Sequence, residues 1–400
     1  MLNNHKYLTT ELLVKLINNL KSERRKIVFT YGTFDLIHSG HAAYLLNAKM
    51  CGDVLIVGIA TNKSNAELRG KGFPLIDQKN RAELLNYFKF VDYTVLVDKQ
   101  DLLPTLKKIR PDVFYTIGAD WKSHLRKQEE AEYVESYGGK IVKLKKVEPF
   151  ISSSSIVEKV ADLKIKEIIE YFFGKIKIDL SKGNWKQSKF SGLKTSVREE
   201  ALYFGDHVKE LSLFSSNFFG QFVKQKDLKT LGQNLRKSGK TIVLSSGACD
   251  LIHAGHARFY KKAKELGDVL VLAIPGNKII TKQKGRGRPI VDEKSRAELM
   301  MFFEFVDYIV IFNDEKIDPI LEDLNPHKFF TVQEDWNENA LKKTDEVQKI
   351  GNWEGMLVSV PPQSPKLSSS RLIRKAAGLR VKELFKEVLK EAENFSTIKD

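Results

Sequence analysis

Apolar runs and segments with helical spacing alternate along roughly the first 150 residues of the chain. The apolar runs are short and continuous, as in "DVLIVGIA" (53–60), which is typical of a strand buried on both faces of a sheet. The segments between them place apolar residues three or four positions apart, and several end at glycine, as helices do. The predicted strands are 26–32, 53–60, 92–97, 112–118 and 140–146, and the predicted helices are 39–52, 78–90, 102–111 and 129–139. This alternation predicts an α/β fold whose parallel sheet is covered by helices on both faces.

The same pattern returns later in the chain. "GDVLIVGIATNK" (52–63) recurs as "GDVLVLAIPGNK" (267–278), and the segment 74–97 recurs at 289–312, each 215 residues further on. A period this long excludes a solenoid and indicates a tandem duplication of one domain. The predicted organisation is a first domain at 1–161 (repeat 1), a partly helical connector at 162–225, a second domain at 226–377 (repeat 2) and an amphipathic helix at 378–400, with a helix leading into each repeat at 9–26 and 226–240.

Charge leaves two interpretations open. The net charge of +15 over 400 residues suits a nucleic-acid-binding protein, but it also suits a lysine-rich enzyme with sites for small anions. The basic residues are dispersed, and we find no helix-turn-helix, zinc-finger or aromatic RNA-binding motif. We therefore favour small anionic ligands and expect no nucleic acid partner.

Hydropathy and cysteine usage bear on where the protein works. No apolar run approaches the ~20 residues that a membrane-spanning helix needs, and the first residues lack the pattern of a signal peptide. The two cysteines, Cys51 and Cys249, are too few for a disulfide framework. We expect a cytoplasmic protein with no membrane span.

Candidate chemistry lies in "GTFDLIHSGH" (32–41), which returns as "GACDLIHAGH" (247–256). Each copy lies between the first strand and the first helix of its repeat, at the strand end where ligands of parallel sheets bind. Glycines permit a tight turn, and a helix that begins there directs unpaired N–H groups and its positive dipole end at an anion. Two imidazoles at that place can donate hydrogen bonds to phosphate oxygens. Two copies in the same context favour phosphate chemistry over structural histidines.

These residues resemble the HxGH nucleotidyltransferase superfamily, in its cytidylyltransferase-like branch. The resemblance covers about 24–161 and 239–377, through "FDLIHSGHAAYLLNAK", "GDVLIVGI", "KGFPLIDQKNRAELL" and "FVDYTVLV". It implies two tandem Rossmann-like domains that transfer a nucleoside monophosphate from an NTP to a phosphorylated small molecule and release pyrophosphate. ATP or CTP would be the nucleotide, and Mg²⁺ would enter bound to it.

The resemblance is nearest to the heptose 1-phosphate adenylyltransferase domain of ADP-heptose synthases, so a sugar 1-phosphate is the favoured acceptor. The tandem ethanolamine-phosphate cytidylyltransferases are an alternative, as is a CTP-dependent enzyme for glycerol 3-phosphate or a similar polyol phosphate. In a further alternative, one repeat only binds nucleotide or regulates the other. The sequence leaves the nucleobase and the acceptor undecided, and a homodimer open.

The resemblance also implies site residues. The residues expected to be catalytic are His38, His41, His253, His256, Lys71, Arg81 and Arg296. Those expected to bind nucleotide are Gly32, Thr33, Phe34, Gly40, Gly118, Asp120, Ser152, Ser153, Ser154, Gly247, Ala248, Cys249, Gly255, Asp335, Ser368, Ser369 and Ser370. Those expected to bind the acceptor or phosphate are Asp35, Arg69, Asp250, Lys284 and Arg286. For Asp35, capping of the turn is an equal alternative, and for Arg81 a surface ion pair is another. No separate set of metal ligands is expected.

The repeats differ at the expected nucleotide pocket. "TIGADW" of repeat 1 (116–121) becomes "TVQEDW" in repeat 2 (331–336), which places a larger and acidic pair there. A carboxylate repels a triphosphate and a larger side chain removes space. We expect repeat 1 to bind nucleotide more tightly.

Overall fold

The computed structural model describes residues 6–98, 102–117, 125–144, 156–160, 220–332, 355–361 and 368–379. Contacts divide the chain into two compact units, one of 1–153 with 218–372 and the other of 154–217 with 373–400. The first unit contains the sheets of both repeats. In the second, residues 156–160 and 373–379 are described, and they are helical. Residues 162–219 of the predicted connector and the predicted helix beyond 379 lie outside the described residues.

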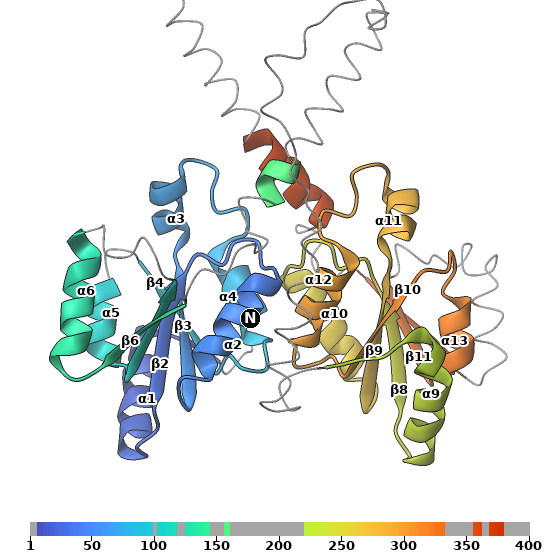
Figure 1. Ribbon diagram of the computed structural model, residues 1–400, viewed down its shortest axis with the longest axis horizontal. Coiled ribbons are helices and arrows are strands. Elements are labelled where there is room, and N and C mark those ends of the chain that lie inside the picture. The colour runs from blue at the N-terminus through green and yellow to red at the C-terminus, as the bar shows by residue number, and fades with distance from the viewer. Residues whose placement is uncertain are drawn as a thin grey trace, which may run out of the picture. The chain divides into compact units, whose positions relative to one another are not determined.

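Repeat 1 folds around one parallel sheet of six strands in the order β1-β4-β3-β2-β5-β6 (Figure 1). Its strands are β1 (Tyr7–Leu8), β2 (Ile27–Gly32), β3 (Val54–Ala60), β4 (Tyr93–Val97), β5 (Val113–Ile117) and β6 (Lys140–Leu144). Its helices are α1 (Thr10–Ser22), α2 (Ser39–Lys49), α3 (Asn62–Arg69), α4 (Gln78–Asn86), α5 (Leu102–Ile109) and α6 (Leu125–Ser136). The predicted alternation is confirmed, with two additions, the short edge strand β1 and helix α3. Helix α3 begins where the Thr61 hydroxyl accepts a hydrogen bond from Ser64 N.

Alternate residues of β2 face the two helical layers, as the period of two in a strand requires. Ile27 and Phe29 belong to the apolar core that includes residues of α1, α5 and α6. On the opposite face, the Thr30 hydroxyl lies 2.5 Å from the Tyr44 hydroxyl of α2. The central strand is therefore covered on both sides, and its carboxyl end leads directly into the candidate loop.

Repeat 2 has the same topology, with strand order β12-β11-β8-β9-β10-β7. Its strands are β7 (Gln221–Phe222), β8 (Ile242–Ser246), β9 (Val269–Pro275), β10 (Tyr308–Phe312), β11 (Lys328–Val332) and β12 (Met356–Val360). Its helices are α9 (Leu228–Lys237), α10 (Ala254–Lys264), α11 (Asn277–Lys284), α12 (Glu293–Met301) and α13 (Asp318–Leu324). Each strand of repeat 1 has its counterpart at the same place in this order, so the predicted equivalence of the two sheets is confirmed. Strand β7, from the end of the predicted connector, adds the edge strand that corresponds to β1.

The two repeats pack through equivalent surfaces. Helix α4 contacts α10, and α12 contacts α2 (Figure 1). Lys89 N donates to Phe302 O (3.1 Å), and Glu304 N donates to Tyr87 O (2.8 Å), so the segment after α4 pairs with the segment after α12. The rings of Phe88 and Phe303 stack between them, with centroids 4.7 Å apart. The packing is isologous: each repeat contributes the same surface, as the two subunits of a symmetric dimer do.

No helix in the described part of the chain is long and apolar enough to cross a membrane. Cys51 and Cys249 are both free thiols. The expected cytoplasmic location stays a prediction.

Candidate functional site

The loop that follows β2 in repeat 1, and β8 in repeat 2, has a strained backbone at one position. Phe34 and Cys249, which correspond in the two repeats, both have φ of 50°, in the left-handed region that residues other than glycine rarely occupy. Close approach explains the preceding glycines. A Cβ on Gly32 would lie 2.8 Å from the Phe34 ring, and one on Gly247 would lie 2.2 Å from the Tyr260 hydroxyl. Such strain is commonly retained at functional sites.

The histidines of each motif lie together at a helix start. Helix α2 begins at Ser39 with His38 as its N-cap, and α10 begins at Ala254 with His253 as its N-cap. The ring centroids of His38 and His41 are 3.9 Å apart, and the distance in repeat 2 is the same. Gly40 and Gly255 are the second residues of their helices. The structure thus brings both predicted imidazole pairs to the positive end of a helix, where an anion is favoured.

Burial keeps all four imidazoles neutral near pH 7. It lowers the pKa of His41 and of His253 to about 4, the latter with a smaller contribution from the charge of Arg258. Burial and the neighbouring imidazole hold the pKa of His38 well below its usual range, and the same causes act on the pKa of His256, together with the charge of Lys284. Neutral imidazoles each carry one N–H to donate.

Hydrogen bonding differs between the two pairs. Nδ1 of His256 accepts a 3.3 Å bond from the backbone N–H of His253, which places the proton of a neutral His256 on Nε2. The Nδ1 atoms of His38, His41 and His253 are buried and have no hydrogen-bond partner among the residues that the structure describes. Buried polar atoms are rarely left unpaired unless a ligand or water completes the site. These atoms therefore indicate a place for a polar ligand in each repeat.

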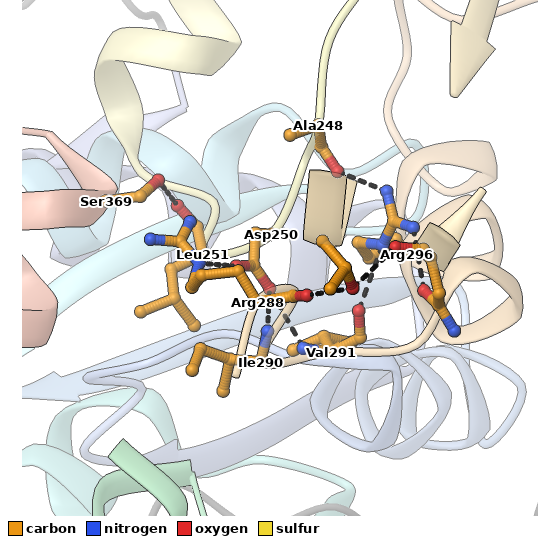
Figure 2. A network of polar contacts seen from close by, with 10 residues as sticks. Ala248, Asp250, Leu251, Arg288, Ile290, Val291, Arg296 and Ser369 are labelled. Carbon is orange, nitrogen blue, oxygen red and sulfur yellow. Dashed lines mark hydrogen bonds and ion pairs between the residues drawn. The ribbon is translucent and has the colours of Figure 1, made fainter. Parts of the chain in front are cut away.

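The motif aspartates connect the loop to a later segment of the chain. Asp35 accepts hydrogen bonds from Leu75 N and Ile76 N, both 2.8 Å. Asp250 accepts from Ile290 N (2.8 Å) and Val291 N (2.9 Å), as Figure 2 shows. Both carboxylates are almost fully buried. The arrangement favours the alternative in which the aspartate fixes the turn, and contact with the acceptor stays a prediction.

An arginine neutralises each aspartate, but the two arginines occupy positions that do not correspond in the two repeats. In repeat 1, Arg69 lies 3.7 Å from Asp35 and stacks over the Phe73 ring. In repeat 2, Arg288 takes the place of Phe73, and its Nε donates to Asp250 at 2.7 Å (Figure 2).

Lys284 stands where repeat 1 has Arg69, and it is exposed, with its charge acting on the pKa of His256. Arg288 thereby takes in repeat 2 the role that Arg69 has in repeat 1. Lys71 and Arg286, in the following loop, are exposed as well.

The two expected catalytic arginines are buried beneath the loops. Arg81 is 1% exposed and donates to Ile76 O (3.0 Å), Thr33 O (2.5 Å) and Asn62 Oδ1 (3.1 Å). Arg296 is 0% exposed. It donates to Val291 O and Ala248 O (Figure 2). It also donates to Pro275 O and Asn277 Oδ1. A surface ion pair, the alternative interpretation of Arg81, is wrong because this guanidinium is buried against backbone carbonyls. The geometry gives both side chains a positioning role, and their contact with phosphate stays a prediction.

The expected serine stretch is described only in repeat 2. Ser369 Oγ donates to Leu251 O at 2.9 Å, so this serine contacts the candidate loop (Figure 2). Ser368 Oγ accepts a bond from Arg371 N, as a helix cap does, and Ser370 is exposed in that helix. The expected residues Gly118, Asp120, Ser152, Ser153, Ser154 and Asp335 lie outside the described residues, as do Gln333 and Glu334.

Several residues of the site were not expected from the sequence. Asn62 and Asn277 accept from the buried guanidinium groups, and their repetition in "TNK" and "GNK" was the available signal. Tyr260 contacts Cys249 at 3.3 Å, where repeat 1 has the larger Phe34. No pattern in the sequence pointed to Arg258, because repeat 1 has alanine there.

Comparison with known proteins agrees with this geometry. A model of the cytidylyltransferase-like family matches residues 29–159 and 244–376, one segment in each repeat and together well over half of the chain. The bifunctional protein HldE of Helicobacter pylori (strain HPAG1) is 38% identical over 148 residues, which are 37% of this chain and 30% of that protein. HldE of Campylobacter curvus (strain 525.92) is 35% identical over 161 residues, 40% of this chain and 32% of that protein.

These matches span about a third of the length of the curated relatives. A crystal structure of the lipopolysaccharide core biosynthesis protein from Thermoplasma volcanium GSS1 is 28% identical, with a TM-score of 0.27, and covers 31% of this chain and 99% of that one. The family match includes both histidine pairs and most of each sheet, without the edge strands β1 and β7. The chain therefore belongs to the cytidylyltransferase-like family of nucleotidyltransferases and carries the family's domain twice.

Proposed function

We propose that the repeats transfer a nucleoside monophosphate from an NTP to a phosphorylated small molecule and release pyrophosphate. The observation that carries this proposal is the pair of buried, neutral imidazoles at a helix start, present in both repeats with the same 3.9 Å spacing. Such a place suits the α-phosphate of a nucleotide, because helix N–H groups and imidazole N–H groups converge on it.

In this reaction an oxygen of the acceptor's phosphate attacks the α-phosphorus and forms a new P–O bond. The bond from the α-phosphorus to the oxygen that bridges to the β-phosphate breaks, and its electron pair leaves with pyrophosphate. Negative charge grows on the non-bridging oxygens in the transition state. His38 and His41, and His253 and His256 in repeat 2, donate to these oxygens. The exposed cations Lys71, Lys284 and Arg286 would neutralise the β- and γ-phosphates.

Mg²⁺ would enter with the NTP and would neutralise part of the triphosphate's charge. Phosphate oxygens fit this role better than the motif aspartates, because each aspartate already accepts two backbone N–H groups beside an arginine. The protein's own contribution is then to bind and orient the phosphates, as neutral imidazoles and buried arginines allow.

A sugar 1-phosphate such as heptose 1-phosphate is the acceptor we favour, with ATP as the nucleotide. The resemblance to the adenylyltransferase domain of ADP-heptose synthases supports it, as do the HldE relatives. CTP with ethanolamine phosphate or a polyol phosphate is the alternative. Retention of the histidine pair in both repeats supports two transferase sites over one silent copy.

A pyrophosphate-release screen tests the proposal. The full chain is assayed with ATP, CTP, GTP and UTP against sugar 1-phosphates, polyol phosphates and amino-alcohol phosphates. We expect release that requires one NTP and one class of acceptor. A chain that binds none of the NTPs and releases pyrophosphate with no pair would contradict the proposed reaction.

A further inference from the structure

One difference between the repeats that breaks their isologous packing lies on the helices that carry the histidines. Glu83 on α4 and Glu298 on α12 correspond, and each lies on a helix that packs on the histidine helix of the other repeat. Two residues after the second histidine of its motif, α10 has Arg258, whereas α2 has Ala43. Only repeat 2 therefore has a cation at this position.

Glu83 of repeat 1 holds this cation. Arg258 Nη1 lies 2.8 Å from Glu83 Oε2, and the carboxylate side chain is only 13% exposed. Charge-assisted bonds of this kind are short and directional, so they fix the plane of a guanidinium. The anchor comes from the helix that also carries Arg81, which holds the loop of repeat 1.

One nitrogen of the guanidinium is left without a partner in the part of the chain that the structure describes. Arg258 Nε is buried and has no hydrogen-bond partner among the described residues. Side chains on a helix lean towards its N-terminus, which here is the end with His253 and His256. The charge of Arg258 lowers the pKa of His253, which agrees with a position near the histidine pair.

We infer that Arg258 binds phosphate oxygens in the site of repeat 2, positioned by Glu83 of repeat 1, and that it distinguishes the specificity of this site from that of repeat 1. The inference rests on the proposed function. Its ligand is an anionic phosphate, which either the NTP or the acceptor could supply. The site of repeat 2 is then incomplete without repeat 1, and the reverse does not hold because Ala43 offers no charge.

The test uses the full chain with His38 and His41 replaced by alanine, so that only repeat 2 can act. Arg258→Met removes the charge and keeps the apolar stem, Arg258→Lys keeps a charge, and Glu83→Gln removes the anchor. Glu298→Gln is the matched control at the equivalent position. Calorimetry with ATP and CTP reports on the nucleotide, and KM for the acceptor in pyrophosphate release reports on the other phosphate. Thermal melting confirms that each variant is folded.

We expect Arg258→Met to weaken one of these two parameters about ten- to hundredfold, the range of one lost charge-assisted bond. Arg258→Lys should recover part of the loss, Glu83→Gln should lose about three- to tenfold, the smaller range of an ordinary hydrogen bond, and Glu298→Gln should match the parent. The NMR titration of His253 should move to higher pH in Arg258→Met, because the positive charge that lowers the pKa of His253 is removed.

Parent-like affinity and acceptor KM in both Arg258→Met and Glu83→Gln would overturn the inference while the proposed function stands. Should Arg258→Met not fold, Glu83→Gln and Arg258→Lys decide by the same criterion. A parent that itself neither binds NTP nor releases pyrophosphate would remove the proposed function of repeat 2, and the inference with it.

Discussion

Replacing Arg81 with lysine separates the two roles open to this residue. The guanidinium donates to three acceptors, Ile76 O, Thr33 O and Asn62 Oδ1, and it is 1% exposed. A lysine keeps the positive charge, but its single nitrogen sits at one point and cannot replace a planar fork. We expect it to retain one of the three contacts and to lose the other two, although Asn62 Oδ1 keeps a second donor in Gln78 N.

The expected loss follows from those two contacts. A hydrogen bond to a charged group contributes about 1.5–3 kcal/mol, and a buried acceptor left unpaired costs about 1–3 kcal/mol. Two lost bonds then amount to roughly 3–6 kcal/mol, a large share of the ~5–15 kcal/mol by which domains are stable. Binding of nucleotide to repeat 1 should weaken too, because the Thr33 carbonyl is no longer held.

Urea unfolding followed by circular dichroism measures the loss, and calorimetry with NTP measures the binding. Arg296→Lys is the matched variant in repeat 2 and should behave alike. Arg25→Lys is the control, since Arg25 is exposed and should tolerate the change. A stability loss below about 1 kcal/mol in Arg81→Lys, together with a raised KM, would refute the positioning role and show a direct phosphate ligand. The 1 kcal/mol limit is the smallest cost of one unpaired acceptor.

Two further predictions concern pH. The pKa of His41 and of His253 is about 4 in the folded chain, against 6.5 when unfolded, so their contribution to stability is present above pH 6.5 and is lost as pH falls towards 4. Each should account for up to about 3 kcal/mol of the free energy of unfolding that is lost between pH 7 and pH 4.5. In urea unfolding, His41→Gln or His253→Gln should therefore lose less stability over this pH range than the parent, and an equal loss would contradict the prediction. Burial raises the pKa of Glu298 to about 7 from 4.5, so the contribution of this carboxyl to stability is present below pH 4.5 and is lost as pH rises through 7. The free energy of unfolding of Glu298→Gln should exceed that of the parent by about 2–3 kcal/mol at pH 8 and equal it at pH 4.5. Equal urea midpoints at pH 8 would contradict this prediction.

Most of the fold could be predicted because its strands are buried on both faces. Continuous apolar runs identify β2, β3 and β4 without any knowledge of their neighbours. The edge strands β1 and β7 could not be predicted, since two residues show no period and owe their pairing to β4 and β10. Helix α3 was missed because "NKSNAELR" is polar, and its start depends on the Thr61 cap.

The candidate site was predictable only where the sequence repeats itself. The histidine pairs were found because their spacing and context recur after 215 residues. For Asp35, capping of the turn was one of two equal alternatives, and the choice required the structure, since the partners of Asp35 and Asp250 lie about 40 residues away and meet them only in the folded chain. An arginine in a sequence shows its charge but not its burial, so the positioning role of Arg81 required the structure.

The different positions of Arg69 and Arg288 show a further limit of prediction from the sequence. Both neutralise a buried aspartate, yet they occupy positions that do not correspond in the two repeats. An alignment of the two repeats would show these differences as two unrelated substitutions. The expected tighter binding by repeat 1 stays a prediction, because Gln333 and Glu334 lie outside the described residues.

The central claim is that the two histidine pairs form nucleotide sites, and calorimetric titration of ATP and CTP into a quadruple variant tests it most directly. In this variant His38, His41, His253 and His256 are all replaced by alanine, and its melting curve is compared with that of the parent. The account predicts a folded protein whose affinity for the preferred NTP falls at least a hundredfold, because all the imidazole donors are gone. A folded quadruple variant that binds the NTP as tightly as the parent would contradict it.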